Sequence, residues 1–209
     1  MFRLVTIERE YGCGAASIAA QLAKRLGWKL WDQLLTDEIA RLAQVDHSAV
    51  KRCDERMDSR FHRLAKTFWR GSYERSSALS NQMFDTDRMM SMMQETMNRI
   101  GKEGNAVVVG RGAPYFLREN PDAFHVFLYA PRAEKIRRLQ ASGKTLEEAE
   151  EQVDTIDRDR MAFVKRYYNA DWPTRSLYHM MINTAVGNEN VISTILSTMH
   201  TLERQLVKV

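Results

Sequence analysis

A segment near the amino end of the chain combines two glycines with the start of a helical pattern, which could hold a phosphate group. It runs from Glu8 to Ser17 with the sequence Glu-Arg-Glu-Tyr-Gly-Cys-Gly-Ala-Ala-Ser. The glycines let backbone N–H groups turn inward, and the amino terminus of a helix adds positive potential. The candidate phosphate-binding residues are Gly12, Cys13, Gly14, Ala15, Ala16 and Ser17.

The segment matches the phosphate-loop pattern G-x-x-x-x-G-K-[ST] only in part. That pattern would place a glycine at Arg9, a lysine at Ala15 and a magnesium-binding hydroxyl at Ala16. On the motif alone, phosphate binding and an ordinary strand-to-helix turn both remain open.

The elements that would position this loop alternate between strand and helix patterns. Apolar runs of strand length occur at residues 2–7, 105–110, 124–129 and 180–183. Helical patterns follow them, beginning with Ile18, Leu22 and Leu26, which repeat every four residues. The alternation predicts an α/β fold with a parallel sheet flanked by helices.

Ligands of such a sheet bind beyond the carboxyl ends of its strands. In this chain those ends lie near Glu8, Gly110, Tyr129 and Thr184. The phosphate-loop candidate follows the first of them, so the predicted sheet and the predicted site agree.

Residues 34–103 contain no convincing strand, and we interpret them as a helical insertion with stretches such as 35–43 and 89–100. Met89, Met93 and Met97 share one helical face, which favours core packing. The alternative is an adaptable surface for a second subunit, which leaves a homodimer open.

Composition narrows the class of protein. The 209 residues carry a net charge of +4, which is too small to require a nucleic-acid partner. Basic residues with helical spacing between Arg56 and Arg75 are most simply a solvated helix face. Cys13 and Cys53 lack the spacing of a zinc site or a disulfide scaffold. With no targeting segment and no long apolar stretch, we expect a soluble, cytoplasmic protein without a membrane partner.

Several segments taken together make the chain resemble the cytidylate-kinase-like family of P-loop nucleoside monophosphate kinases. The likeness runs nearly end to end. It is carried by residues 10–14, 22–28, 31–32, 107–112, 126–131, 167–168, 171–172, Tyr178 and 182–184.

The resemblance implies a single P-loop kinase-like domain over residues 1–209. In it, residues 34–103 would be the insertion on the acceptor side, and residues 143–172 would form a helical, lid-like segment. The cofactors it implies are ATP and Mg²⁺, and the partners are nucleotide substrates.

The resemblance also assigns roles, each with an alternative. Arg111, at the end of a strand, would contact the acceptor phosphate, or else be tied to loop carbonyls. Asp32 would lie near the acceptor, or cap the helix that follows. Arg138 would flank the donor base, or lie on a solvated helix face. Gly112 and His179 stand where relatives often have acids.

The run Asp157-Arg158-Asp159-Arg160, followed by Arg166, resembles the lid that brings arginines over the transferred group. Interleaved opposite charges can also be salt-bridge decoration of a helix. We predict catalytic roles for Arg158, Arg160 and Arg166, with Arg9 as a further cation and Ser17 as a weak metal ligand.

The leading hypothesis is an ATP-dependent kinase of a nucleoside monophosphate, CMP or dCMP first, weakened because the loop lysine is absent. A nucleotide-binding protein with little or no catalysis is the alternative. A nucleic-acid-binding module that uses the basic insertion ranks third.

Overall fold

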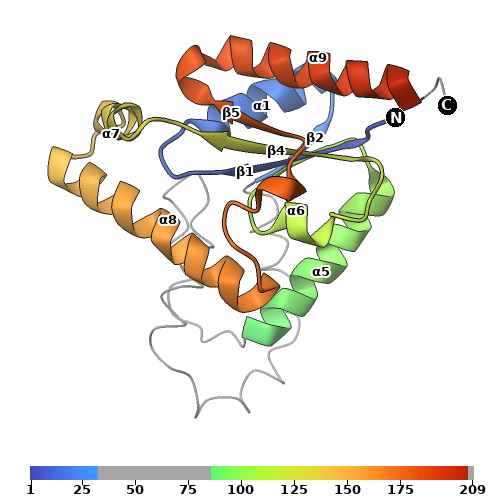
Figure 1. Cartoon of the computed structure of the whole chain (residues 1–209), viewed down its shortest axis with the longest axis horizontal. Helices are drawn as coiled ribbons and strands as arrows, with labels where there is room; N and C mark the ends of the chain where they lie inside the picture. The colour runs from blue at the N-terminus through green and yellow to red at the C-terminus, as the bar shows by residue number, and fades with distance from the viewer. Residues whose placement is uncertain (33–85, 207–209) are drawn as a thin grey trace.

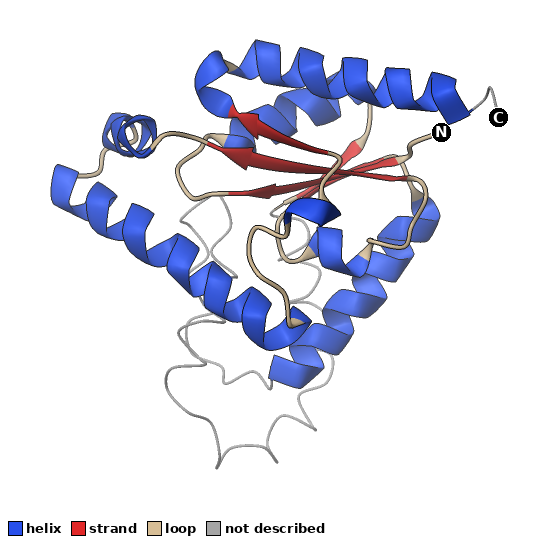
Figure 2. Cartoon of the chain, in the orientation of Figure 1, coloured by secondary structure: helices blue, strands red, loops and turns tan. Residues whose placement is uncertain are grey.

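The computed structural model describes residues 1–32 and 86–206, and a five-stranded parallel sheet lies at its centre (Figure 1, Figure 2). The strand order is β2-β3-β1-β4-β5, and each neighbouring pair is parallel. The strands are β1 (Leu4–Arg9), β2 (Lys29–Trp31), β3 (Ala106–Val109), β4 (Ala123–Tyr129) and β5 (Met180–Asn183).

Helices cover both faces of the sheet, as Figure 1 shows. One face carries α1 (Ala15–Leu26) and α9 (Asn188–Leu206). The other carries α5 (Thr86–Glu103), α6 (Ala113–Phe116) and α8 (Leu146–Tyr168). α7 (Arg132–Ala141) follows β4 and packs against α8, and two 3₁₀ turns, η2 (Arg175–Leu177) and η3 (Thr184–Val186), flank β5. The predicted α/β class is confirmed.

All four apolar runs that the sequence marks as strands are strands in the structure, and the last has the predicted bounds. The fifth strand, β2, was not predicted because it has only three residues, too few to show a period. Within the predicted insertion the structure describes α5. The predicted helix at 35–43, the basic residues 56–75 and Cys53 lie outside the described residues.

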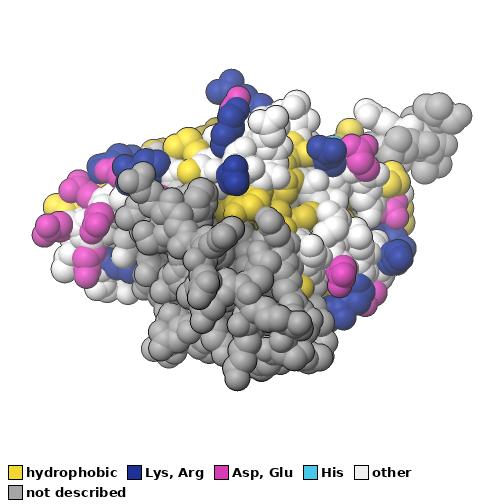
Figure 3. Space-filling model, turned by 90° about the horizontal axis from the view of Figure 1, so that it is seen from below, with side chains coloured by type: hydrophobic (Ala, Val, Ile, Leu, Met, Phe, Trp, Pro, Cys, Tyr) yellow, Lys and Arg dark blue, Asp and Glu magenta, His cyan; other side chains and the backbone are white. Residues whose placement is uncertain are grey.

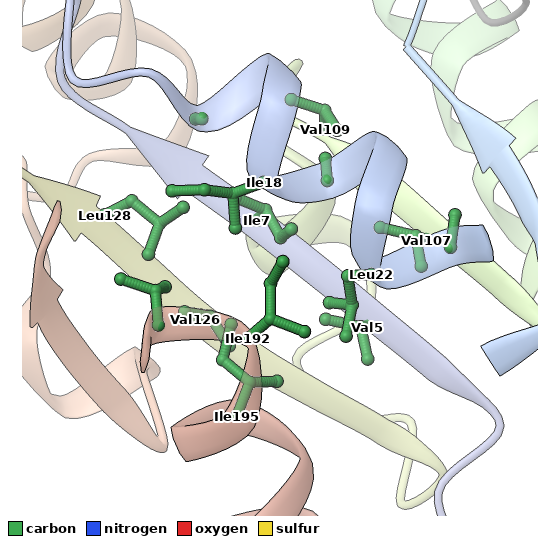
Figure 4. Close-up of a cluster of buried hydrophobic side chains, with 14 of the residues drawn as sticks. Val5, Ile7, Ile18, Leu22, Val107, Val109, Val126, Leu128, Ile192 and Ile195 are labelled. Carbon is green, nitrogen blue, oxygen red and sulfur yellow. The ribbon is translucent and has the colours of Figure 1, made fainter. Parts of the chain in front are cut away.

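The larger core lies between the sheet and the pair α1 and α9 (Figure 4). Alternate residues of β1 point to opposite faces, so Val5 and Ile7 enter this core while Leu4 enters the other. The side chains labelled in Figure 4 are Val5, Ile7, Ile18, Leu22, Val107, Val109, Val126, Leu128, Ile192 and Ile195.

The second core joins the opposite face of the sheet to α5 and α8. Met93 and Met97 are fully buried there against Leu4, Val108 and Phe163. The prediction that this methionine face packs into the core is therefore confirmed for these two residues. The side chain of Met89 lies outside the description.

Two further features bear on the whole fold. α8 begins with a capping box, in which Thr145 accepts from the backbone N–H of Glu148 and Glu148 accepts from that of Thr145. No described helix combines the length and the apolar composition that a membrane crossing requires.

One buried histidine, His125, should make the stability of this fold depend on pH. His125 lies in β4 with its Nδ1 2.6 Å from Thr6 Oγ1, and its backbone N–H donates to His179 Nδ1 at 3.0 Å. Burial, together with the charge of His179, lowers the pKa of His125 from 6.5 to about 4, and burial also lowers the pKa of His179. Between pH 6.5 and about pH 4, His125 is therefore protonated in the unfolded chain and neutral in the folded chain.

The lowered pKa gives stability that is complete above pH 6.5 and is lost as the pH falls toward 4. For His125 alone we expect a loss of about 2 kcal/mol between pH 7.5 and pH 5. Urea unfolding at both pH values measures it. His125→Gln should flatten the dependence, whereas replacing the exposed His200 with Gln should leave it as in the wild type; equal slopes in all three proteins would contradict this account.

Candidate phosphate-binding site

The predicted phosphate loop connects the end of β1 to the start of α1, at the carboxyl edge of the central strand. Gly12 and Gly14 both have positive φ, 75° and 83°. The first N–H groups of an α-helix have no acceptor within the helix, and they give the amino terminus of α1 positive potential. This part of the chain has the backbone that a phosphate cradle needs.

A cavity of about 360 Å³ opens at this loop. Residues 9–16 line it from the loop and the start of α1. Its remaining lining comes from α7, the turn after it and α8, namely Arg138, Leu139, Ser142, Lys144 and Arg160.

Among the described residues that line the cavity, four side chains are cationic and one is acidic. The cations are Arg9, Arg138, Arg160 and Lys144, and the acid is Glu10. The carboxylates that pair with the arginines lie behind them, because Glu8, Glu134 and Asp157 do not line the cavity. The cavity therefore presents positive charge to whatever enters it.

Arg160 is the lid candidate that reaches the loop. Its side chain is 6% exposed, and its Nη1 donates to the carbonyl oxygen of Arg9 and to Asp157 Oδ1, both at 2.9 Å. Burial lowers the pKa of Arg160, and the nearby positive charge of Arg9 lowers it further. Two guanidinium groups thus stand close together at the cavity, where an anion would relieve their repulsion.

Asp157 fastens α8 to the loop from the same turn. Its Oδ1 accepts from the backbone N–H of Tyr11 at 2.8 Å, and its Oδ2 lies 3.5 Å from Lys135 Nζ. Lys135 also pairs with Glu10 at 3.0 Å. The Asp157–Arg160 pair is i,i+3, so the interpretation as helix salt bridges holds for it, but these residues hold the loop as well.

Arg138 is bound to the loop rather than solvated. Its Nη1 donates to the carbonyl oxygen of Cys13 and to Thr184 Oγ1, and its Nη2 donates to the carbonyl oxygen of Thr184 at 3.0 Å. Glu134 accepts from its Nε at 2.7 Å. The alternative of a solvated helix face is therefore wrong for Arg138, which joins the loop to the end of β5.

Cys13 contributes a neutral thiol to the loop. It is 1% exposed, and burial raises the pKa of the thiol to about 11. A thiol with such a pKa is a weak nucleophile at neutral pH, so we assign Cys13 a packing role in the loop.

Other predicted residues lie away from the cavity. Arg158 and Arg166 are exposed and do not line it. Ser17 is exposed too, and its hydroxyl accepts from Gln21 Nε2 at 3.0 Å and from Asn188 Nδ2 at 3.2 Å. Asp32 is 6% exposed directly after β2.

Arg111 lies in an unusual turn at the end of β3. Gly110, Arg111 and Gly112 have φ values of 65°, 56° and 69°, so three consecutive residues are left-handed. The Arg111 side chain is 2% exposed. This places a buried guanidinium at the carboxyl edge of the strand next to β1.

Packing favours glycine at position 112. A Cβ added to Gly112 would lie 2.1 Å from the hydroxyl oxygen of Tyr168, the last residue of α8. His179 accepts the backbone N–H of His125 and stacks on Phe124 at 5.0 Å. Both residues therefore have defined local contacts.

The sequence alone did not mark Asp157, Lys144 or Tyr168 as site residues. Asp157 lay within the run of interleaved charges, and its i,i+3 spacing to Arg160 was a usable signal. Lys144 and the Tyr168–Gly112 contact depend on how α7 and α8 fold back, which a local pattern does not encode.

Comparisons with known proteins agree with this fold. A sequence model of the cytidylate kinase-like family matches residues 4–186. No curated protein matches the sequence.

Solved structures share the fold at low identity. An uncharacterized protein from Eubacterium ventriosum has a TM-score of 0.63 and 20% identity, covering 94% of this chain and 99% of that one. Shikimate kinase from Acinetobacter baumannii has a TM-score of 0.52 and 15% identity, with 96% and 94% covered. A gluconokinase from Sinorhizobium meliloti has a TM-score of 0.52 and 12% identity, and the match covers 97% of this chain and 94% of that one.

Proposed function

Because the chain belongs to the cytidylate kinase-like family, we propose that it transfers a phosphoryl group from ATP to a nucleoside monophosphate, with CMP or dCMP as the first acceptors. The observation that carries the proposal is the cavity of about 360 Å³ at the loop between β1 and α1, lined by backbone donors and four cationic side chains. Phosphoryl transfer needs mainly positioning and charge neutralisation, which such a lining supplies.

The donor phosphates would lie on the loop and the start of α1. Arg9 and Arg160 would neutralise the charge that the missing lysine at Ala15 does not, since both are buried, cationic and part of the lining. Arginine suits this role because its planar group binds two phosphate oxygens at once. Arg158 and Arg166, which are exposed and outside the lining, fit it less well.

The side chains at the loop offer few ligands for Mg²⁺. Ala16 has no hydroxyl, the Ser17 hydroxyl is held by Gln21 and Asn188, and the described residues contain no cluster of three or more metal ligands. We therefore assign Mg²⁺ no protein ligand among these residues, and we expect it to enter with ATP.

The acceptor would bind beside the donor loop, at the ends of β3 and β2. Arg111 and Asp32 follow these neighbouring strands, so their backbones lie at one edge of the sheet. We propose Arg111 for the acceptor phosphate and Asp32 for the acceptor nucleoside. The predicted acceptor-side insertion lies largely outside the described residues.

A nucleotide-binding protein with little catalysis is the second candidate, and the pair Ala15 and Ala16 favours it, since these positions normally carry the lysine and the hydroxyl. The third candidate, nucleic-acid binding, gains no support from the face in Figure 3, where Lys and Arg are interspersed with Asp and Glu over the coloured surface.

Two measurements test the proposal. Saturating ADP at about a hundredfold above its Kd should raise the melting temperature by about 5 °C or more. A coupled assay with ATP and Mg²⁺ across the common nucleoside monophosphates should then detect turnover.

Matched lysine variants locate the site. Lys144→Glu reverses a charge that lines the cavity and should weaken ADP binding about tenfold or more, whereas Lys102→Glu, on the exposed face of α5, should not. No thermal shift with ADP would refute nucleotide binding here, and binding without turnover of any acceptor would establish the second candidate.

A further inference from the structure

The turn that carries Arg111 is held on both sides by groups that α8 positions. Gly110 and Gly112 adopt positive φ without strain, so the cost of this left-handed turn falls on Arg111, an L-residue with a φ of 56°. The surrounding structure must therefore stabilise this turn. Backbone hydrogen bonds hold part of it, such as the one that the Gly110 N–H donates to the carbonyl oxygen of Ile7 at 2.8 Å, and the side chains of Arg9 and Tyr168 pack on its two glycines.

On the first side, the guanidinium of Arg9 lies against the backbone of Gly110. A Cβ at Gly110 would lie 1.6 Å from Arg9 Nη1, so the two groups are in direct contact. The backbone of Arg9 is paired with Leu128 of β4, and α8 contacts it too, since Arg160 Nη1 donates to its carbonyl oxygen at 2.9 Å. Arg9 and Arg160 both line the cavity in which we place the donor phosphates, called the donor cavity below.

On the second side, the hydroxyl of Tyr168 lies on Gly112. Its ring is stacked on Tyr115 with centroids 4.4 Å apart and an interplanar angle of 10°, and it meets Phe116 edge-on at 5.6 Å. The hydroxyl is buried and has no hydrogen-bond partner among the described residues. No hydrogen bond therefore sets the position of this hydroxyl, and the packing of the ring places it on Gly112.

Arg160 and Tyr168 are eight residues apart in one uninterrupted helix. This spacing corresponds to about 12 Å along a helix axis. A helix transmits displacement over such a length, so a movement of α8 that changes the contact at Arg9 also changes the contact at Gly112. Figure 1 shows α8 running from beside α7, near the loop, to the region of α5 and α6.

The burial of Arg111 adds a requirement. With 2% of the residue exposed, a phosphate reaches its guanidinium only after a neighbouring group moves. A ligand anion that attracts Arg9 and Arg160 in the cavity changes one of the side-chain contacts on the turn.

We propose that α8 couples the two halves of the site, so that occupation of the donor cavity changes the affinity of the Arg111 turn for the acceptor, with Arg160 and Tyr168 as positioning residues. This inference rests on the proposed function, since it takes the cavity and the Arg111 turn as the two binding sites.

The test measures the Kd for CMP by calorimetry, without ADP and with saturating ADP, a pair that cannot react forward. In the wild type we expect the two values to differ about tenfold, within the usual range of coupling between sites. Tyr168→Phe keeps the stacked ring but removes the atom that lies on Gly112, so the ratio should fall below about threefold. Tyr167→Phe, one residue away, should keep the wild-type ratio.

A ligand-free measurement accompanies it. The amide of Ala113 donates to the carbonyl oxygen of Gly110 at 3.0 Å, so its hydrogen exchange reports opening of the turn. Exchange should be several-fold faster in Tyr168→Phe than in Tyr167→Phe.

The outcomes separate this inference from the proposed function. If ADP and CMP both bind but the ratio in Tyr168→Phe equals that of the wild type, the coupling is refuted and the kinase proposal stands. A uniform loss of CMP affinity with an unchanged ratio would make Tyr168 a direct ligand contact instead, which also overturns the inference. If neither ADP nor any nucleoside monophosphate binds, the proposed function fails and the coupling with it. If hydrogen exchange at Ala113 is the same in Tyr168→Phe as in Tyr167→Phe, the Tyr168 hydroxyl does not stabilise the turn, which also overturns the inference.

Discussion

Replacing Arg160 with methionine is expected to lower kcat by about a hundredfold or more. The side chain is buried at the cavity, and it is one of the two guanidinium groups that we assign to the charge normally neutralised by the loop lysine. Loss of one preorganised electrostatic contact costs on the order of 3 kcal/mol in the transition state. Methionine has a similar reach without the charge, so the change removes mainly the electrostatic contribution.

The controls for Arg160→Met are variants of other arginines in the same helix, α8. Arg158→Met and Arg166→Met remove exposed charges from α8 outside the cavity, and each should stay within about twofold of the wild type. All kcat values are compared at a temperature at which circular dichroism shows every variant folded, because Arg160 also binds Asp157 and the loop.

A second variant asks whether a lysine can take over. Ala15 lines the cavity at the position of the usual lysine, so Ala15→Lys in the Arg160→Met background should recover part of the lost rate. A fast wild type that is indifferent to Arg160→Met and Arg9→Met would refute the assignment of charge neutralisation to these arginines.

Local patterns carried the prediction of the sheet and of the loop. Val5 and Ile7 alternate with Leu4 and Thr6 along β1, and the glycines after the strand sit where the chain turns into α1. Each feature depends on neighbours in sequence, where period and turn chemistry act. The strand β2 was not predicted, because its three residues are defined by pairing with Ala106 to Val108 of β3, which are far away in sequence.

The sequence pointed to the loop backbone and to Arg9, Arg138 and Arg160, which line the cavity, but not to their contacts. Gly12 and Gly14 marked the loop, but the roles of Arg138 and Asp157 came from contacts with residues far away in sequence, such as Thr184 and Tyr11. The alternatives of lid and salt-bridge decoration for residues 157–160 were both incomplete, because Arg160 forms a helix ion pair and a loop contact at once. A helical charge pattern specifies the first contact and not the second.

Gly112→Ala is expected to destabilise the fold by about 3 kcal/mol or more. Its φ of 69° is left-handed, which costs an L-residue about 1–2 kcal/mol. In addition, the new Cβ would lie 2.1 Å from the hydroxyl oxygen and 2.8 Å from Cζ of Tyr168, which is too close without displacement of the ring. Overpacking of this kind typically costs a further 1–3 kcal/mol.

Gly27→Ala separates the two contributions, since Gly27 has nearly the same φ, 67°, but nothing lies within 4 Å of its added Cβ. We expect it to cost only about 1 kcal/mol, the backbone share. Combining Gly112→Ala with Tyr168→Phe removes the nearer of the two clashing atoms and should restore about 1 kcal/mol, because the contact at Cζ remains. Urea unfolding of the wild type and the three variants gives these values. If Gly112→Ala costs no more than Gly27→Ala, then Tyr168 does not press on the Arg111 turn, and the packing reason for glycine at this position is wrong.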